Sequence, residues 1–419
     1  MKINELTNKT LPEVRFPDSE GMWKRQSLDE LFEYRPTNSL SRDDLNYLCG
    51  DTQNIHYGDI HTSFRSSFDA TRESVPSINC GISTAKLKEA DYCRVGDVVM
   101  ADASEDYSDI GKSIEIINLD NKWTVAGLHT ILLRPKMDSF VTGFLAPLFQ
   151  SWKVRLQIMT YAQGTKVLGI PKNWLSRIEL DYPKEIEQQK IAGFFSAVDE
   201  RIAQLEKKKE LLLKYKKGVM QQIFSQKIRF KAPSGNSFSD WEEKRLRDVC
   251  QINPKTGNLP EEFIYIDLES VECGSLNKET TILRGDAPSR AQRVLKRGDI
   301  LFQTVRPYQS NNLIFDREGN YVASTGYAQI RAKGDKNFLF QALLSFSFLK
   351  DVIRRSTGSN YPAINSEDLA DIKLAIPSLP EQKRIGDLLS SIDGKLESIG
   401  RQIEKTKTFK KGLLQQMFV

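Results

Sequence analysis

Two stretches of the chain carry apolar residues at alternating intervals of three and four positions. The first stretch lies within residues 184–228 and the second within residues 378–419. The residues that form this pattern are Ile191, Phe195, Val198, Ile202, Leu205 and Leu212 in the first copy and Ile385, Leu389, Ile392, Leu396, Ile399 and Ile403 in the second. Such spacing lines up apolar side chains on one helix face and is typical of a coiled-coil seam. Lys216 and Lys410 interrupt it.

The length of these helices bears on how they pack. A helix of roughly 40 residues is about 60 Å long, which exceeds the radius of a small domain. We therefore expect the two helices to pack on each other, antiparallel, as a spacer. The alternative is two ordinary amphipathic helices packed against separate cores. Ser378 and Glu381 have the spacing of a capping box at the start of the second helix, with a proline in its first turn.

The helical stretches belong to an internal repeat. Residues 183–224 and 377–418 align without a gap, and both copies end in Lys-Lys-Gly, two apolar residues, Gln-Gln, one apolar residue and Phe. An Arg-Phe pair followed by a tryptophan, Trp23 or Trp241, opens each half. The first helix runs on into the Arg-Phe pair that precedes Trp241. The corresponding continuation of the second helix, an Arg-Phe pair, is found near the start of the chain, before Trp23. The order indicates two similar units joined in a circle and cut once, with a pseudo-two-fold relation and adjacent termini.

The segments between the helices predict mixed α/β structure. Short β-branched and aromatic runs that predict strands are Val95–Met100, Ile114–Ile117, His129–Leu133, Ile300–Thr304 and Tyr327–Ile330. Short helices are predicted at Asp138–Gln150 and Asn337–Lys350. In each half a Gly-Asp pair, ending at Asp97 or Asp299, is interpreted as the turn before a buried strand.

The predicted fold class is therefore α+β, with two mixed α/β domains separated by two long helices that form an antiparallel coiled coil. The predicted segments are a first domain at 1–183, a spacer helix at 184–228, a second domain at 229–377 and a second spacer helix at 378–419.

Composition narrows the class of protein. The chain has 419 residues, of which 39% are hydrophobic and 27% charged, as in an ordinary globular protein of more than one domain. No run approaches the roughly 18 apolar residues of a membrane helix, and the first residues lack the apolar core of a signal peptide. The five cysteines include no Cys-x-x-Cys pair, so we expect reduced thiols, without disulfide or metal roles, in a cytoplasmic protein.

The net charge of +5 is concentrated on the helical stretches. Residues 184–240 and 378–419 together hold 20 Lys/Arg against 12 Asp/Glu, whereas the globular segments are nearly neutral. This balance predicts weak DNA binding by the chain alone, with a partner that supplies most phosphate contacts. The basic runs Lys207–Lys209 and Lys405–Lys411 could face phosphate or an acidic partner, or could be an ordinary solvated helix face.

The doubled helix motif and the tryptophan openers resemble the specificity subunits of type I restriction–modification systems, over nearly the whole chain. The resemblance implies that each globular segment is a target recognition domain that reads one half of a bipartite, non-palindromic site in double-stranded DNA. The helices would set the spacing and dock two adenine-N6 methyltransferase (M) subunits, and motor–nuclease (R) subunits would add cleavage. It also implies no membrane association and no cofactor in this chain, because S-adenosylmethionine, ATP and Mg would be bound by the partner subunits.

Motifs for catalysis are absent from the sequence. The Asp/Asn-Pro-Pro-Tyr/Phe tetrapeptide of adenine methyltransferases does not occur, and Asn253-Pro254 lacks the aromatic residue that stacks a flipped base, so we interpret it as a turn. No Gly-x4-Gly-Lys-Ser/Thr loop occurs. His56 and His61 have no metal-ligand partners at a suitable spacing and are interpreted as surface or turn residues. We therefore expect neither a catalytic residue nor a metal site.

Candidate DNA-contacting residues are polar and basic side chains in loops, since Arg can pair with guanine and Gln or Asn with adenine. They are Gln303, Arg306, Tyr308, Gln309, Asn311, Arg290, Arg293, Ser359 and Asn360 in the second domain and Thr165 and Lys166 in the first, where Arg65, Arg72 and Lys112 are less specific candidates. An ordinary polar loop, or a structural turn that is repeated in both halves, is the open alternative.

Two other functions stay open at this point. A coiled-coil scaffold whose globular ends bind proteins predicts no DNA binding even when a methyltransferase is present. A stand-alone DNA-modifying enzyme predicts methylation or cleavage by the purified chain.

Overall fold

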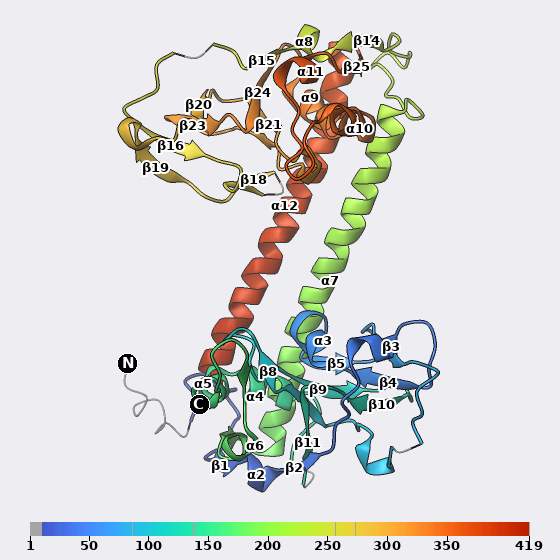
Figure 1. Cartoon of the computed structure of the whole chain (residues 1–419), viewed down its shortest axis with the longest axis vertical. Helices are drawn as coiled ribbons and strands as arrows, with labels where there is room; N and C mark the ends of the chain where they lie inside the picture. The colour runs from blue at the N-terminus through green and yellow to red at the C-terminus, as the bar shows by residue number, and fades with distance from the viewer. Residues whose placement is uncertain (1–10, 86, 137–138, 256, 273, 419) are drawn as a thin grey trace. The chain divides into compact units, whose positions relative to one another are not determined.

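The chain divides into two compact units that share both long helices. The computed structural model describes residues 11–85, 87–136, 139–255, 257–272 and 274–418. Unit 1 contains the described residues up to Glu206 together with those from Gln402 onward, and unit 2 is Lys207–Arg401. The division passes through α7 (Glu185–Phe224) and through α12 (Leu379–Gln416), which Figure 1 shows as continuous helices. Each unit therefore contains a globular part and a segment of each helix.

Unit 1 is built on a five-stranded sheet with strand order β2-β11-β7-β9-β5 and a four-stranded sheet with order β10-β4-β6-β3. Its strands are β1 (Lys24–Ser27), β2 (Phe32–Arg35), β3 (Leu45–Asn46), β4 (Thr52–Ile55), β5 (Ser67–Asp69), β6 (Ser77–Ile78), β7 (Val98–Ala101), β8 (Ala103–Ser104), β9 (Ser113–Asn118), β10 (Trp123–Ala126), β11 (Thr130–Pro135), β12 (Leu168–Gly169) and β13 (Glu179–Tyr182). Its shorter helices are α2 (Leu28–Leu31), α3 (Tyr57–Thr62), α4 (Leu145–Gln150), α5 (Trp152–Tyr161) and α6 (Lys172–Leu175). The central strand β7 is buried on both faces because all four of its residues are apolar.

Unit 2 repeats the central strand order in a sheet β15-β24-β21-β22, beside a second sheet β19-β16-β23-β20. Its strands are β14 (Glu242–Arg245), β15 (Cys250–Ile252), β16 (Glu262–Ile266), β17 (Val271–Glu272), β18 (Ser275–Leu276), β19 (Thr280–Leu283), β20 (Ala291–Val294), β21 (Ile300–Gln303), β22 (Leu313–Ile314), β23 (Tyr321–Ser324), β24 (Tyr327–Ala332) and β25 (Lys373–Ile376). Its shorter helices are α8 (Leu246–Val249), α9 (Lys336–Leu343), α10 (Phe346–Arg355) and α11 (Ser366–Ala370). The two domains thus share a framework that their divergent sequences do not reveal.

The five predicted strands are all present, as β7, β9, β11, β21 and β24, and the predicted fold class is confirmed. Strand β7 begins three residues later than predicted because Gly96, at φ +91°, forms the turn before it. Of the helix predicted from Asp138, which lies outside the described residues, only the last six residues are helical, as α4. The helix predicted from Asn337 is two helices, since Ser345 caps a second one, α10. The predicted domain boundaries stay predictions.

The α7 and α12 segments pack in opposite directions in unit 2. The Lys216 ammonium donates to the Asp393 carboxylate over 2.6 Å, and a side-chain carbon at Gly400 would lie 3.8 Å from Lys209 Nζ. A step of seven residues forward along α7, from Lys209 to Lys216, therefore accompanies a step of seven residues back along α12. In this unit the helices are antiparallel.

Unit 1 shows the same packing with the opposite ends of the helices. Asp199 accepts from Lys410 at 2.7 Å, and Glu206 pairs with Lys407 at 2.8 Å. Ten of the twelve predicted seam residues are buried, and Ile202 and Leu212 are half-buried. One apolar cluster in each unit contains residues of both helices and of the globular part, so the alternative of two helices in separate cores is wrong.

Each tryptophan opener packs on a helix end. Trp23 meets Phe418 with ring centroids 6.1 Å apart, and Trp241 meets Phe224 at 6.4 Å, both edge to face. The Val14 N–H also donates to the Gln416 carbonyl at 3.0 Å. The C-terminal end of α12 thus packs against the tryptophan of unit 1 in the way that the C-terminal end of α7 packs against the tryptophan of unit 2. The interrupted circular repeat predicts this equivalence.

The predicted capping box at α12 is wrong. The Glu381 carboxylate is fully buried and accepts hydrogen bonds from Arg229 at 2.9 Å and from Trp241 Nε1 at 3.2 Å. The Ser378 hydroxyl is buried and has no hydrogen-bond partner in the described part of the chain. The repeated Glu therefore anchors the linker before each domain, because Glu187 binds Arg15 in the same way at 2.7 Å in unit 1.

Candidate nucleic-acid interface

The strongest candidate interface in unit 2 is the loop that leaves buried strand β21 and returns as β22. Gln303 and Asn312 hold its two ends together, since the Gln303 N–H donates to Asn312 Oδ1 at 2.7 Å. The Gln303 amide also donates to Gln309 Oε1 at 2.8 Å and accepts from the Asn311 N–H at 3.0 Å. Gln303 is only 1% exposed. Both ends of its amide are used inside the loop, so Gln303 positions the loop and is not placed to contact a base.

Arg306 lies at the turn of this loop with its charge unopposed. Its φ of +53° is the left-handed conformation, and its N–H donates to the Pro362 carbonyl at 2.7 Å. Its guanidinium lies 4.1 Å from the centre of the Tyr361 ring, a cation–π contact. Arg306 Nε has no hydrogen-bond partner, and none of the described carboxylates forms an ion pair with this side chain. A guanidinium that an aromatic ring orients and that has no carboxylate partner can bind a phosphate or a guanine edge.

The neighbouring hairpin contributes the second half of this surface. Thr357 and Ala363 form a bridge that closes it, and Ala363 also bridges to Val305 at the start of the Arg306 loop. Ser359 and Asn360 lie exposed at its tip. The aromatic side chains Tyr308 and Tyr361 are 55% and 65% exposed. The two loops that the sequence singled out separately are thus brought together as one polar and aromatic surface.

The two remaining candidate arginines of unit 2, Arg290 and Arg293, lie beside this surface at the start of β20. Arg290 is exposed, and its carbonyl accepts from the Thr325 N–H at 2.8 Å. The carbonyl of Gly326, the residue after Thr325, accepts from the Thr304 N–H at 3.0 Å. This hydrogen bond connects the turn at Thr325 to the loop that carries Arg306. Arg293 is half-buried, burial lowers its pKa, and its Nε has no partner in the described residues.

Unit 1 has the equivalent loops but different chemistry. The hairpin that carries Thr165 and Lys166 pairs through β12 with β8, and both residues are exposed. The adjacent loop carries the carboxylates of Glu105, Asp106 and Asp109 and the 55% exposed Tyr107, with no counterpart of Arg306. The two units therefore present unlike side chains from like positions.

The less specific candidates in unit 1 have protein partners. Arg72 pairs with Glu200 at 2.5 Å, Arg65 lies 3.9 Å from Glu73, and Lys112 donates to the His61 carbonyl at 2.5 Å. These contacts give each of the three cations a role within the fold.

The sequence did not indicate that the histidines of the chain form one cluster. The rings of His56, His61 and His129 lie 4.6, 5.9 and 5.3 Å from the ring of Tyr57. Of the two interpretations of His56, surface or turn residue, the structure supports the turn. His56 is buried, accepts from the Gly58 N–H at 3.1 Å and caps α3. Burial lowers its pKa. His61 Nε2 lies 2.9 Å from the carbonyl oxygen of β8, beside the candidate loop.

The sequence raised three other sites: a metal site, the Asn253 turn and the cysteines. The described residues contain no group of three or more His, Cys, Asp or Glu arranged to hold a metal ion. Asn253, at φ +47°, binds the backbone of Gln329, as a turn residue does. The Cys80 thiol lies 2.6 Å from the sulfur atom of Cys49, and both are free thiols on exposed loops. No helix of the described chain has both the length and the apolar character that crossing a bilayer requires.

Residues 238–407 match the family described as the type I restriction modification DNA specificity domain. The chain is 28% identical over 293 residues to the type I restriction enzyme MjaVIII specificity subunit of Methanocaldococcus jannaschii, an alignment that covers 64% of this chain and 68% of that protein. It is 26% identical over 348 residues to the putative MjaX specificity subunit of the same organism, covering 78% and 80%.

Solved structures share the fold across the whole chain. The crystal structure of the type I restriction–modification S subunit from M. genitalium superposes with a TM-score of 0.61 at 16% identity, covering 98% of this chain and 99% of that one. A chain from a study of complex assembly and conformational transition of the type I system gives a TM-score of 0.52 at 16% identity, covering 96% and 98%.

Proposed function

The chain belongs to the family of type I restriction–modification specificity subunits, and from this premise we propose that it reads a bipartite, non-palindromic DNA target, one half with each unit. The observation that carries the proposal is the pair of equivalent loop surfaces with unlike side chains. Unit 2 presents an oriented, unopposed Arg306 beside Tyr361, and unit 1 presents carboxylates at the equivalent loop. Different base-reading groups on one framework favour two different half-sites.

We propose that α7 and α12 set the spacing between the half-sites and dock two adenine-N6 methyltransferase subunits. The repeat supports this role, because identical partners require surfaces that occur twice. The exposed residues Lys217, Gln221 and Gln222 of α7 recur as the exposed residues Lys411, Gln415 and Gln416 of α12. Motor–nuclease subunits would complete the assembly in the cytoplasm. S-adenosylmethionine, ATP and Mg would be bound by those partners, and this chain would contribute recognition without catalysis.

The test is co-expression of the chain with its methyltransferase, followed by genome-wide mapping of N6-methyladenine. We expect a gapped two-part motif. Exchange of residues 240–377 for those of a relative should change only one half of it, and a change in both halves would contradict separate reading by the two units. Absence of methylation together with absence of DNA binding would favour the protein-binding scaffold, and methylation or cleavage by the purified chain would favour the stand-alone enzyme.

A further inference from the structure

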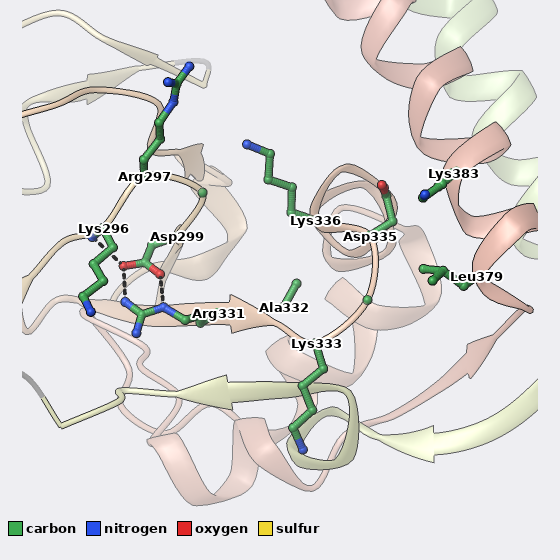
Figure 2. A pocket seen from close by; sticks show the side chains of 12 residues that line it. Lys296, Arg297, Asp299, Arg331, Ala332, Lys333, Asp335, Lys336, Leu379 and Lys383 are labelled. Atoms are coloured by element: carbon green, nitrogen blue, oxygen red, sulfur yellow. Dashed lines mark hydrogen bonds and ion pairs between the residues drawn. The ribbon is translucent and has the colours of Figure 1, made fainter.

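A basic pocket lies within unit 2. Its volume is about 690 Å³. Its walls come from the turn before β21, the end of β24 and the first turns of α9 and α12. The residues that line it are Lys296, Arg297, Gly298, Asp299, Arg331, Ala332, Lys333, Gly334, Asp335, Lys336, Leu379 and Lys383. Figure 2 shows Lys296 and Arg297 on one wall, Lys336 in the middle, and Lys383 with Leu379 from α12 on the opposite wall.

Six cationic side chains therefore face two carboxylates, and both carboxylates are occupied by contacts that build the fold. Asp299 is 1% exposed and binds Arg331 through two hydrogen bonds of 2.8 and 2.9 Å (Figure 2). Asp335 caps α9 by accepting from the Phe338 N–H at 2.8 Å. Neither carboxylate has the freedom to neutralise the lysines around the cavity.

Besides Arg331, which binds Asp299, two more of the six cations have partners within the fold. Arg297 binds Asp316 at 2.5 Å, and Lys333 donates to the carbonyl oxygens of Arg247 and Asp248. Lys296, Lys336 and Lys383 differ, because none of them forms an ion pair or a hydrogen bond through its ammonium group with another described residue. Three lysines without an ion pair among the described residues thus line the pocket, and Lys336 also lies near enough to Asp316 to lower the pKa of that carboxyl.

The start of α12 adds to this positive potential. Both α9 and α12 begin at the pocket, but the Asp335 carboxylate caps the first turn of α9, so the partial positive charge that favours anions is available at the first turn of α12. Lys336 is the first residue of α9, and Lys383 lies one turn into α12. The site combines fixed dipoles with mobile cations, which suits a phosphate group.

Only part of the excess charge is specific to unit 2, because Arg94 of unit 1 stands at the position of Lys296. The buried pair Asp299–Arg331 has a counterpart in unit 1, Asp97–Arg134 at 2.7 Å, so that pair belongs to the common framework. The positions equivalent to Arg297, Leu379 and Lys383 hold Val95, Glu185 and Gln189 in unit 1. A docking site for two copies of one methyltransferase should occur in both units. The lysine at 383 in place of Gln189, and the uncharged Leu379 in place of Glu185, make this pocket more positive than its counterpart in unit 1.

We propose that this pocket binds a backbone phosphate of the duplex DNA next to the half-site that unit 2 reads. The proposal rests on the proposed function and adds to it a contact that fixes the position of the duplex but carries no base information. It assigns the binding to Lys296, Lys336 and Lys383, assisted by the first turn of α12.

The test uses the complex of the full chain with its methyltransferase and the double variant Lys296→Gln/Lys383→Gln, because both side chains are exposed and their removal leaves no buried gap. Binding to a duplex with the methylated motif and to one without it is measured by fluorescence anisotropy across a range of KCl concentrations. We expect affinity for both duplexes to fall about tenfold at low salt, and the slope of log K against log[KCl] to become shallower by about 0.9 for one lost phosphate contact. The matched control is Lys350→Gln/Lys395→Gln, two exposed lysines of unit 2 outside the pocket, and its slope should stay at the wild-type value.

Each other outcome overturns the pocket assignment. An unchanged slope and affinity in the pocket variant would show that no phosphate binds there. Loss of the methyltransferase from the complex on gel filtration, with no change in DNA affinity of the intact fraction, would assign the pocket to an acidic partner surface. If the wild-type complex itself binds no DNA, the proposed function fails together with the pocket; if it binds normally and only the variant result is negative, the pocket proposal alone fails.

Discussion

The Lys216 ammonium contacts the Asp393 carboxylate at 2.6 Å, and both residues come from the long helices. Their counterparts in the repeat, Lys410 and Asp199, make the same contact at 2.7 Å in unit 1. The two lysines are the positions that interrupt the apolar seam. Asp393 also accepts from Gln341 of α9 at 2.7 Å, so this one carboxylate links both helices to the globular part of unit 2. A polar pair inside an apolar seam penalises shifted registers, because a shift would leave a charge without a partner.

This pair should contribute measurable coupling. We expect a double-mutant cycle of Lys216→Ala and Asp393→Ala to give a coupling free energy of about 1 kcal/mol for unfolding in urea, since the lysine is largely buried. The exposed pair Arg401 and Glu397 on α12 is the control and should give a few tenths of that value. Equal coupling free energies in the two cycles would show that the Lys216–Asp393 pair stabilises the fold no more than an exposed ion pair does.

The seam itself should behave as a core. Leu389 is completely buried in the cluster shared by α12, α7 and the globular part of unit 2. We expect Leu389→Ala to lower the free energy of unfolding by about 2–5 kcal/mol, through lost apolar burial and the remaining cavity. Leu211→Ala, at a 53% exposed position of α7, should change it by less than about 0.5 kcal/mol. A small effect at Leu389, measured by urea denaturation, would mean that the helices do not depend on this contact.

A buried carboxyl in unit 1 predicts a pH effect. Burial raises the pKa of Glu115 to about 7, although its oxygens accept from the N–H groups of Gly143 and Ala146 at the start of α4. When the pKa of a carboxyl is higher in the folded state than in the unfolded state, protonation of that carboxyl stabilises the folded state. That contribution is complete below its ordinary pKa of 4.5 and is lost as the pH rises through about 7.

We therefore expect the stability of Glu115→Gln relative to wild type to increase between pH 5 and pH 8. Thermal melts at intervals of half a pH unit measure this difference. The exposed Glu105→Gln in the same unit should follow the wild-type profile in parallel. Parallel profiles for both variants would indicate that Glu115 is ionised in the folded protein throughout this range.

Arg306 should determine specificity in one half-site only. We expect Arg306→Ala to weaken binding of the methyltransferase complex to its target by about 5- to 150-fold, which corresponds to about 1–3 kcal/mol for a lost base contact. Arg306→Lys should recover only part of this affinity, because an ammonium group cannot form the bidentate contact of a guanidinium. Arg354→Ala, an exposed arginine of α10 paired within its own helix, is the control. Anisotropy on duplexes with single-base changes in each half-site distinguishes a base contact from a phosphate contact, which would weaken all duplexes equally.

The sequence by itself determined the elements whose causes are local or repeated. Heptad spacing predicts the two long helices because apolar residues must share one face, and the duplicated motif predicts that Phe418 and Phe224 have equivalent roles. The strands after Gly96 and Gly298 were likewise readable from short buried runs.

Tertiary structure alone decided which side chains meet. Arg306 and Tyr361 are separated by 54 intervening residues, and no local pattern places one over the other; the order of strands and the hairpin bridge to Val305 do so. Gln303 was predicted as a base-reading residue from its type, yet burial against Asn312 makes it a support for the loop. Residue type records what a side chain can bind, whereas its partner depends on backbone positions fixed by contacts between distant segments.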